Sequence, residues 1–115
     1  MRGFFDTYYY KEFIIGFNLN YCFMDELKSK RHHEYVKFRD DVSKNGANIA
    51  YVNAIHKYLN SSEEMSQIIL KMLCDMMKKT DNNTTFKECM YKYWKSTVFN
   101  QEQLERYRVL REKIN

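Results

Sequence analysis

The residues best suited to chemistry in this sequence are His32, His33 and Glu34, in the stretch HHEYVKFRDDV. Imidazole and carboxylate groups bind Zn²⁺ and transfer protons. Adjacent residues on a helix point about 100° apart, so these three side chains do not converge on one ion. Val36 and Lys37 occupy the positions four residues later, where a second ligand would have to stand. We therefore expect no metal site here, and a solvated helix start instead.

Nucleophilic catalysis finds equally little support. The cysteines Cys22, Cys74 and Cys89 are far apart and form no C-x-x-C pair. Cys74 lies in a very apolar stretch, where a cysteine usually packs as a small hydrophobic residue. Asp40 and Asp41 are neighbours on a predicted surface helix, and the three glycines form no phosphate-binding loop. We expect a protein that is not an enzyme and that uses no cofactor.

The cysteines also bear on the compartment. Three widely spaced cysteines suit reduced thiols better than a disulfide framework. No stretch is long and apolar enough to cross a bilayer, and the opening MRGFF runs directly into Asp6, so no signal peptide is visible. We expect an intracellular protein, cytoplasmic or nuclear, that is neither secreted nor bound to a membrane.

Composition predicts the fold class. The chain has 115 residues, no proline and only three glycines. Sheet-rich folds need frequent turns, and turns favour glycine and proline. Aromatic residues make up 17% of the chain and supply bulk for a core. We expect a single all-α domain over residues 1–115, a compact bundle of five to six helices.

The first segment, FFDTYYYKEFIIGF, is open to two interpretations. Its apolar spacing suits a helix that begins after Asp6 and ends at Gly16 and Asn18. Tyrosine and isoleucine clusters also favour strands. We expect a helix, with a strand as the alternative.

Two helices follow before the middle of the chain. The first covers residues 20–29, where apolar residues recur every three positions. The periodicity stops near Lys30–His32, so a break is expected there. The next helix covers residues 33–44, and Gly46 follows as a stop signal.

A fourth helix is expected over residues 48–59, followed by the most apolar helix of the chain. The pattern Ser61-x-x-Glu64 predicts a capping box at the start of that apolar helix. Most of its circumference is apolar, at Met65, Ile68, Ile69, Leu70, Met72, Leu73, Cys74, Met76 and Met77. Such a helix is either central in the core or presents a methionine-rich surface to a partner.

The last third of the chain predicts two more helices. Thr85-x-x-Glu88 repeats the capping-box pattern before FKECMYKYWKS. Asn100 is expected to cap the final helix, QEQLERYRVLREKIN. In the segment YKYWKS, we expect Tyr91, with Trp94 or Tyr93, to anchor its helix to the core.

The same segment raises the possibility of nucleic-acid binding. It interleaves cations with aromatic rings, as stacking platforms do, and arginines follow on the last helix. The net charge of +4 is mild and interspersed, whereas nucleic-acid binders usually concentrate their cations. The candidate contacts for this alternative are Lys92, Trp94, Lys95, Arg106, Arg108 and Arg111.

Residues 21–73 resemble the paired amphipathic helix (PAH) domain of Sin3-type transcriptional corepressors. Tyr35-x-x-Phe38 and Val42 match the pattern of the second helix in that family. The match to the third helix consists of Tyr51, Val52, Ile55, Tyr58 and Leu59. The match to the fourth consists of Met65, Ile69, Met72 and Leu73. Residues 1–20 and 74–115 would be additional helices around this four-helix core.

The resemblance implies a function in protein–protein interaction. PAH domains accept an amphipathic helix of a transcription factor in the groove between their first two helices, a form of helix-in-groove recognition. A role in transcriptional regulation is then expected. Carried over by position, the partner-groove residues are Met24, Leu27, Tyr35, Phe38 and Val42.

A third possibility is that residues 1–20 and 74–115 cover this groove or pair with a second copy. The chain would then form a homodimer or a closed bundle with another functional surface. The richness in tyrosine, lysine and asparagine also suits a viral or phage accessory protein that inhibits a host factor.

Overall fold

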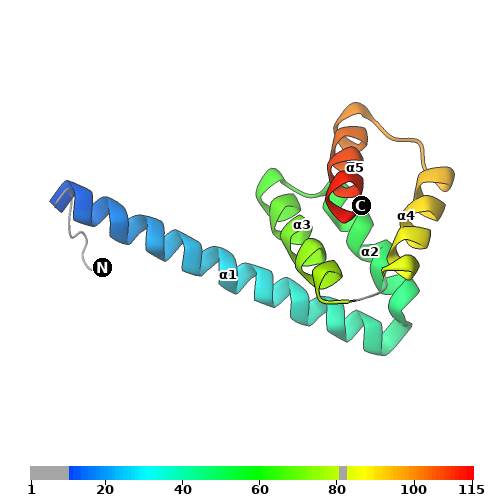
Figure 1. The fold of residues 1–115 in the computed structure, drawn as a ribbon, viewed down its shortest axis with the longest axis horizontal. Coiled ribbons are helices and arrows are strands. Elements are labelled where there is room, and N and C mark those ends of the chain that lie inside the picture. The colour runs from blue at the N-terminus through cyan, green and yellow to red at the C-terminus, as the bar shows by residue number, and fades with distance from the viewer. Residues whose placement is uncertain (1–10, 81–82) are drawn as a thin grey trace. The chain divides into compact units, whose positions relative to one another are not determined.

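The computed structural model describes residues 11–80 and 83–115, with side chains from Asp25 onward (Figure 1). All regular secondary structure in this part of the chain is α-helical, which confirms the predicted all-α class. The helices are α1 (Lys11–Asn45), α2 (Ala47–Asn60), α3 (Glu63–Lys78), α4 (Thr84–Ser96) and α5 (Gln101–Ile114). None of them is long and apolar enough to cross a membrane.

Helix α1 replaces the separate helices expected before residue 45. The predicted ends at Gly16 and Asn18 and the predicted break at Lys30–His32 are wrong, because the helix continues through all of them. A glycine inside a helix costs about 1 kcal/mol, which a long helix tolerates. The polar tract that looked like a break is a solvated stretch of helix. The expected start after Asp6 lies outside the described residues.

The chain divides into two compact units, Met1–His32 and His33–Asn115. The boundary falls inside α1, near the predicted break. The first unit contributes the part of α1 that starts at Lys11. The second unit contains residues 33–45 of α1 together with α2 to α5.

Gly46 makes the turn between α1 and α2. Its φ of 94° and ψ of 160° lie in a region that L-residues with a side chain avoid. Its N–H donates to the carbonyl of Val42, and its own carbonyl accepts from Ala50. The predicted stop is therefore confirmed, and α2 begins one residue from its expected start.

The helix caps agree with the sequence at only one of the three predicted sites. Asn100 caps α5 in a complete capping box with Gln103. The cap of α3 is Ser62, which accepts from the Met65 N–H, and not Ser61. Asn83 precedes α4 without a side-chain cap, so the predicted box at Thr85 is also wrong.

The core of the second unit is built around α2, which packs against α3, α4 and α5. Ile55, Leu73, Phe86 and Leu110 are fully buried where these helices meet. The apolar circumference of α3 is used in this core, and Met72 and Met77 are buried. Met65 and Met76 are half-buried against the same core, so α3 is mainly a core helix.

Candidate partner-binding surface

The stretch from His32 to Val42 divides between solvent and core. His32 and His33 are exposed, but Glu34 is only 6% exposed, so the expectation of a solvated Glu34 is wrong. The Lys57 ammonium of α2 lies 2.7 Å from the Glu34 carboxylate, and the Lys37 ammonium lies 3.6 Å from it. The ion pair of Glu34 with Lys57 therefore links α1 to α2.

The predicted groove residues all lie on one helix, α1, and not on two successive helices. Met24 and Leu27 belong to the first unit, and the side chain of Met24 lies outside the described residues. Tyr35 and Phe38 follow on the same continuous helix. The turn that the PAH resemblance requires between the first and second helices is absent from α1. Val42 is half-buried near the end of this helix.

Phe38 points toward the core while Tyr35 points outward. The Phe38 ring lies 5.6 Å from the Tyr51 ring, which in turn contacts the buried Phe86 edge-on at 5.1 Å. Tyr35 is 36% exposed, and the Arg39 guanidinium lies 5.8 Å from its ring centroid. A pocket of about 120 Å³ beside Phe38 is small and partly lined by Asp41 and Lys57. Phe38 therefore packs on α2, and Tyr35 stays at the surface.

A larger concave site lies between α4 and α5, which we call the α4–α5 groove. The two helices meet through large side chains rather than through close backbone approach, and they stand apart in Figure 1. Trp94 stacks on Tyr107 with ring centroids 4.9 Å apart. The Tyr107 hydroxyl donates to the Met90 carbonyl at 3.1 Å. Phe99, from the linker between the helices, packs against both rings.

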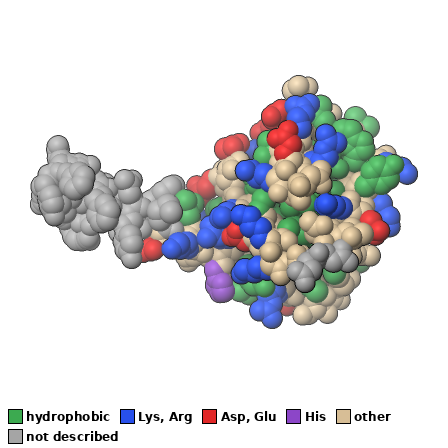
Figure 2. Space-filling model, in the orientation of Figure 1, with side chains coloured by type: hydrophobic (Ala, Val, Ile, Leu, Met, Phe, Trp, Pro, Cys, Tyr) green, Lys and Arg blue, Asp and Glu red, His purple; other side chains and the backbone are tan. Residues whose placement is uncertain are grey.

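These contacts leave a pocket of about 250 Å³ between the helices. Its lining consists of Lys87, Met90, Tyr91, Trp94, Tyr107, Arg111, Ile114 and Asn115. Tyr91 is 61% exposed and Trp94 is 39% exposed, so two large rings remain available to a ligand. Figure 2 shows hydrophobic side chains gathered over the α4 side of this unit, with Lys and Arg side chains beside them.

Tyr91 is therefore a surface residue, contrary to its expected role as an anchor in the core. Tyr93 and Trp94 of the same helix do pack, on Phe99. Positions 87, 91 and 94 share the face of α4 that lines the pocket. On that face Trp94 packs on Tyr107, while Tyr91 remains 61% exposed. That recurrence was visible in the sequence, but it could not show that α4 and α5 leave a gap.

The structure brings only part of the nucleic-acid candidate set to one place. Trp94 and Arg111 line the α4–α5 groove, and the Lys95 ammonium lies 5.2 Å from the Tyr91 ring centroid. Lys92 is exposed and does not line it. The Arg108 guanidinium pairs with the Glu105 carboxylate of the same helix at 2.7 Å.

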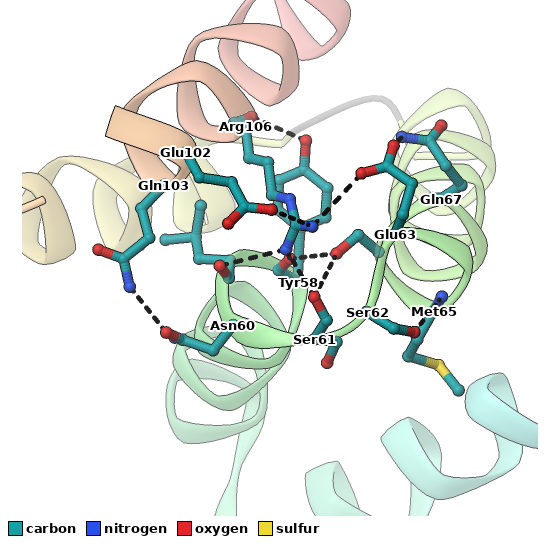
Figure 3. A network of polar contacts seen from close by, with 12 residues as sticks. Tyr58, Asn60, Ser61, Ser62, Glu63, Met65, Gln67, Glu102, Gln103 and Arg106 are labelled. Atoms are coloured by element: carbon teal, nitrogen blue, oxygen red, sulfur yellow. Dashed lines mark hydrogen bonds and ion pairs between the residues drawn. The ribbon is translucent and has the colours of Figure 1, made fainter. Parts of the chain in front are cut away.

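Arg106, the remaining member of that set, is used inside the protein (Figure 3). Its side chain is only 11% exposed. The guanidinium reaches from α5 over the end of α2 and donates to the carbonyls of Tyr58, Leu59 and Ser61 at 3.3, 3.3 and 2.8 Å. The last carbonyls of a helix lack helical partners and attract cations. Arg106 is therefore a structural residue.

Two acidic side chains and one hydroxyl complete the surroundings of Arg106. Its guanidinium lies 2.9 Å from the Glu102 carboxylate and 3.4 Å from that of Glu63. The Tyr58 hydroxyl donates to the backbone carbonyl of Arg106 at 2.7 Å. Burial raises the pKa of Tyr58 to about 12.

The described thiols are poorly suited to nucleophilic chemistry. Burial raises the pKa of both Cys74 and Cys89. A thiol with a raised pKa is protonated near neutral pH, and the thiolate is the reactive form.

The third histidine contributes to packing between helices. His56 Nδ1 lies 2.8 Å from the Tyr93 hydroxyl, and this contact joins α2 to α4.

Comparisons with known proteins identify no relative of this chain. A scan against family models, a search of curated proteins and a search of solved structures found no match to this chain. The functional argument therefore depends on the site itself.

Proposed function

We propose that this chain is a non-enzymatic protein-interaction module that accepts an amphipathic helix of another protein in the α4–α5 groove. The observation that carries the proposal is a concave gap between two helices whose lining includes the exposed rings of Tyr91 and Trp94. Aromatic residues are enriched where partners bind, because they supply large contact area at small entropic cost. A function in transcriptional regulation, implied by the PAH resemblance, remains part of the proposal.

The size of the site favours a protein partner over a metabolite. Small-molecule pockets usually enclose about 300–1,000 Å³. The α4–α5 groove encloses about 250 Å³ and is open to solvent beside Tyr91. That volume suits one or two anchoring side chains of a helix, spaced three or four residues apart.

The packing of the rings also favours protein over single-stranded nucleic acid. Bases stack on open aromatic faces. The Trp94 ring already contacts both Phe99 and Tyr107, and the Lys95 ammonium lies near the Tyr91 ring. The groove offers a concave site beside the partly exposed rings of Tyr91 and Trp94, which suits inserted aliphatic or aromatic side chains.

Two exposed tyrosines give a matched test of where the partner binds. A phage library of helical peptides, about four turns long with randomised faces, would be selected on the full chain. Tyr91→Glu changes the α4–α5 groove, and Tyr35→Glu makes the same change on the α1 face implied by the PAH resemblance. Each tyrosine has a cation near its ring.

We expect the selected peptides to lose binding to Tyr91→Glu and to retain it with Tyr35→Glu. Circular dichroism would verify that both variants remain helical. Loss with Tyr35→Glu alone would transfer the function to the α1 face. A selection that enriches nothing above the empty support would refute the proposed function.

A further inference from the structure

The α4–α5 groove has a charge pattern that its own fold does not use. Lys87 of α4 and Arg111 of α5 both line it, and the lining contains no aspartate or glutamate. Neither cation has an ion pair with another residue in the described part of the chain. The Lys95 ammonium adds a third positive charge near the Tyr91 ring.

Many other surface cations of this protein are neutralised locally. Lys44 pairs with Asp40 at 3.1 Å, and Lys71 pairs with Asp75 at 3.1 Å. These pairs connect neighbouring turns of one helix, where such contacts form readily. The cations along the groove differ in that they flank the exposed rings of Tyr91 and Trp94, so a ligand seated there would meet their charge.

We propose that the partner helix is acidic, with apolar side chains that enter the α4–α5 groove and carboxylates that meet Lys87 and Arg111. This inference rests on the proposed function and adds the chemistry of the partner to it. The two cations lie on different helices and are both part of the lining. A helix lying along the groove therefore presents carboxylates to both sides when they flank its apolar stripe. Such charge complementarity selects partners and speeds their association.

The test compares two double charge reversals with the same change in net charge. Lys87→Glu/Arg111→Glu reverses the groove. Lys78→Glu/Lys113→Glu is the matched control, because these lysines line a different pocket, between α3 and α5. Helical peptides would be selected on the wild-type chain, and the net charge of the enriched sequences would be compared with that of the unselected library. Dissociation constants of an enriched peptide would then be measured on all three proteins.

We expect enrichment of acidic peptides on the wild-type chain. Their affinity should fall by about tenfold or more on the groove reversal and by less than about threefold on the control. Added salt should weaken wild-type binding. Enrichment of neutral or basic peptides that still require Tyr91 would overturn the acidic partner and leave the proposed function standing. Absence of any enrichment would instead remove the proposed function.

A nucleic-acid ligand is distinguished by a separate arm of the experiment. Fluorescein-labelled single-stranded DNA would be titrated into the wild-type chain with and without an enriched peptide. We expect the DNA not to compete with the peptide. If the DNA competed with the peptide on the wild-type chain and not on the Lys87→Glu/Arg111→Glu variant, the groove would bind nucleic acid and the acidic helix would be overturned.

Discussion

Replacement of Arg106 by alanine should destabilise the fold more than replacement of Lys37, Lys57 or Arg108. The side chain is 11% exposed and donates to three carbonyls at the end of α2. Hydrogen bonds to a charged group contribute about 1.5–3 kcal/mol each. All three contacts come from one guanidinium nitrogen, Nη1; the one to Ser61 at 2.8 Å is short, and those to Tyr58 and Leu59 at 3.3 Å are longer.

We therefore count one full contact and two weaker ones, for a loss of about 3–4 kcal/mol. The exposed carboxylates of Glu63 and Glu102 add less than about 1 kcal/mol. For a domain of this size, the loss corresponds to a fall in melting temperature of roughly 15 °C. Arg106→Lys should lose about half as much, because one ammonium retains the charge but reaches fewer acceptors.

The assay is urea unfolding followed by far-ultraviolet circular dichroism, with the free energy of unfolding extrapolated to water. Arg108→Ala is the control on the same helix. That side chain is 48% exposed and pairs with a single carboxylate, so its loss should change the free energy of unfolding by less than about 0.5 kcal/mol. Equal effects of Arg106→Ala and Arg108→Ala would refute the reasoning.

Three further predictions concern other parts of the second unit. Gly46→Ala should lower the free energy of unfolding by about 1–3 kcal/mol in urea titrations, because φ is 94° although the site has open space for a Cβ. Lys57→Met should destabilise by about 1–2 kcal/mol and Lys37→Met by less than about 0.5 kcal/mol in the same assay, because only Lys57 lies 2.7 Å from the buried Glu34. Burial raises the pKa of Tyr58 to about 12, above its ordinary value near 10. The contribution of Tyr58 to the free energy of unfolding is therefore complete below about pH 10 and falls by about 2 kcal/mol as pH rises toward 12. Urea midpoints at about pH 9 and about pH 11.5 should therefore differ less in Tyr58→Phe than in the wild type.

Each of these predictions has an outcome that would contradict it. If Gly46→Ala had the same free energy of unfolding as the wild type, the turn would have relaxed to a negative φ. Similar losses from Lys57→Met and Lys37→Met would show that the Glu34 carboxylate is not selectively paired. If the urea midpoint of Tyr58→Phe fell at alkaline pH as much as that of the wild type, groups other than Tyr58 would be responsible for the loss of stability.

The sequence predicted those elements whose signals are local. The start of α2 follows from a glycine after a periodic stretch, and the start of α5 follows from the Asn100 cap. The predicted break at Lys30–His32 failed because loss of apolar periodicity marks a solvated stretch of helix as well as a helix end. The predicted cap at Ser61 is one residue early, because the adjacent Ser62 carries the same hydroxyl and caps α3 instead.

Features that depend on distant residues could not be predicted. Glu34 is buried because Lys57, on the next helix, supplies its counter-charge. Arg106 looked like a free surface cation, but its acceptors are carbonyls about 45–48 residues earlier in the chain. The segment YKYWKS was considered only as a nucleic-acid site, whereas the pocket beside it is formed together with Tyr107 and Arg111 of α5, which sequence could not place.

The central claim is that a partner helix binds in the α4–α5 groove, and Trp94 offers the most direct measurement. It is the single tryptophan of the chain and it lines the groove. A tryptophan-free, labelled helical peptide selected on the protein would be titrated while its anisotropy and the Trp94 emission are recorded together. We predict that both signals change along one saturation curve with the same dissociation constant. Saturating anisotropy with unchanged Trp94 emission would contradict the claim and place the partner elsewhere on the surface.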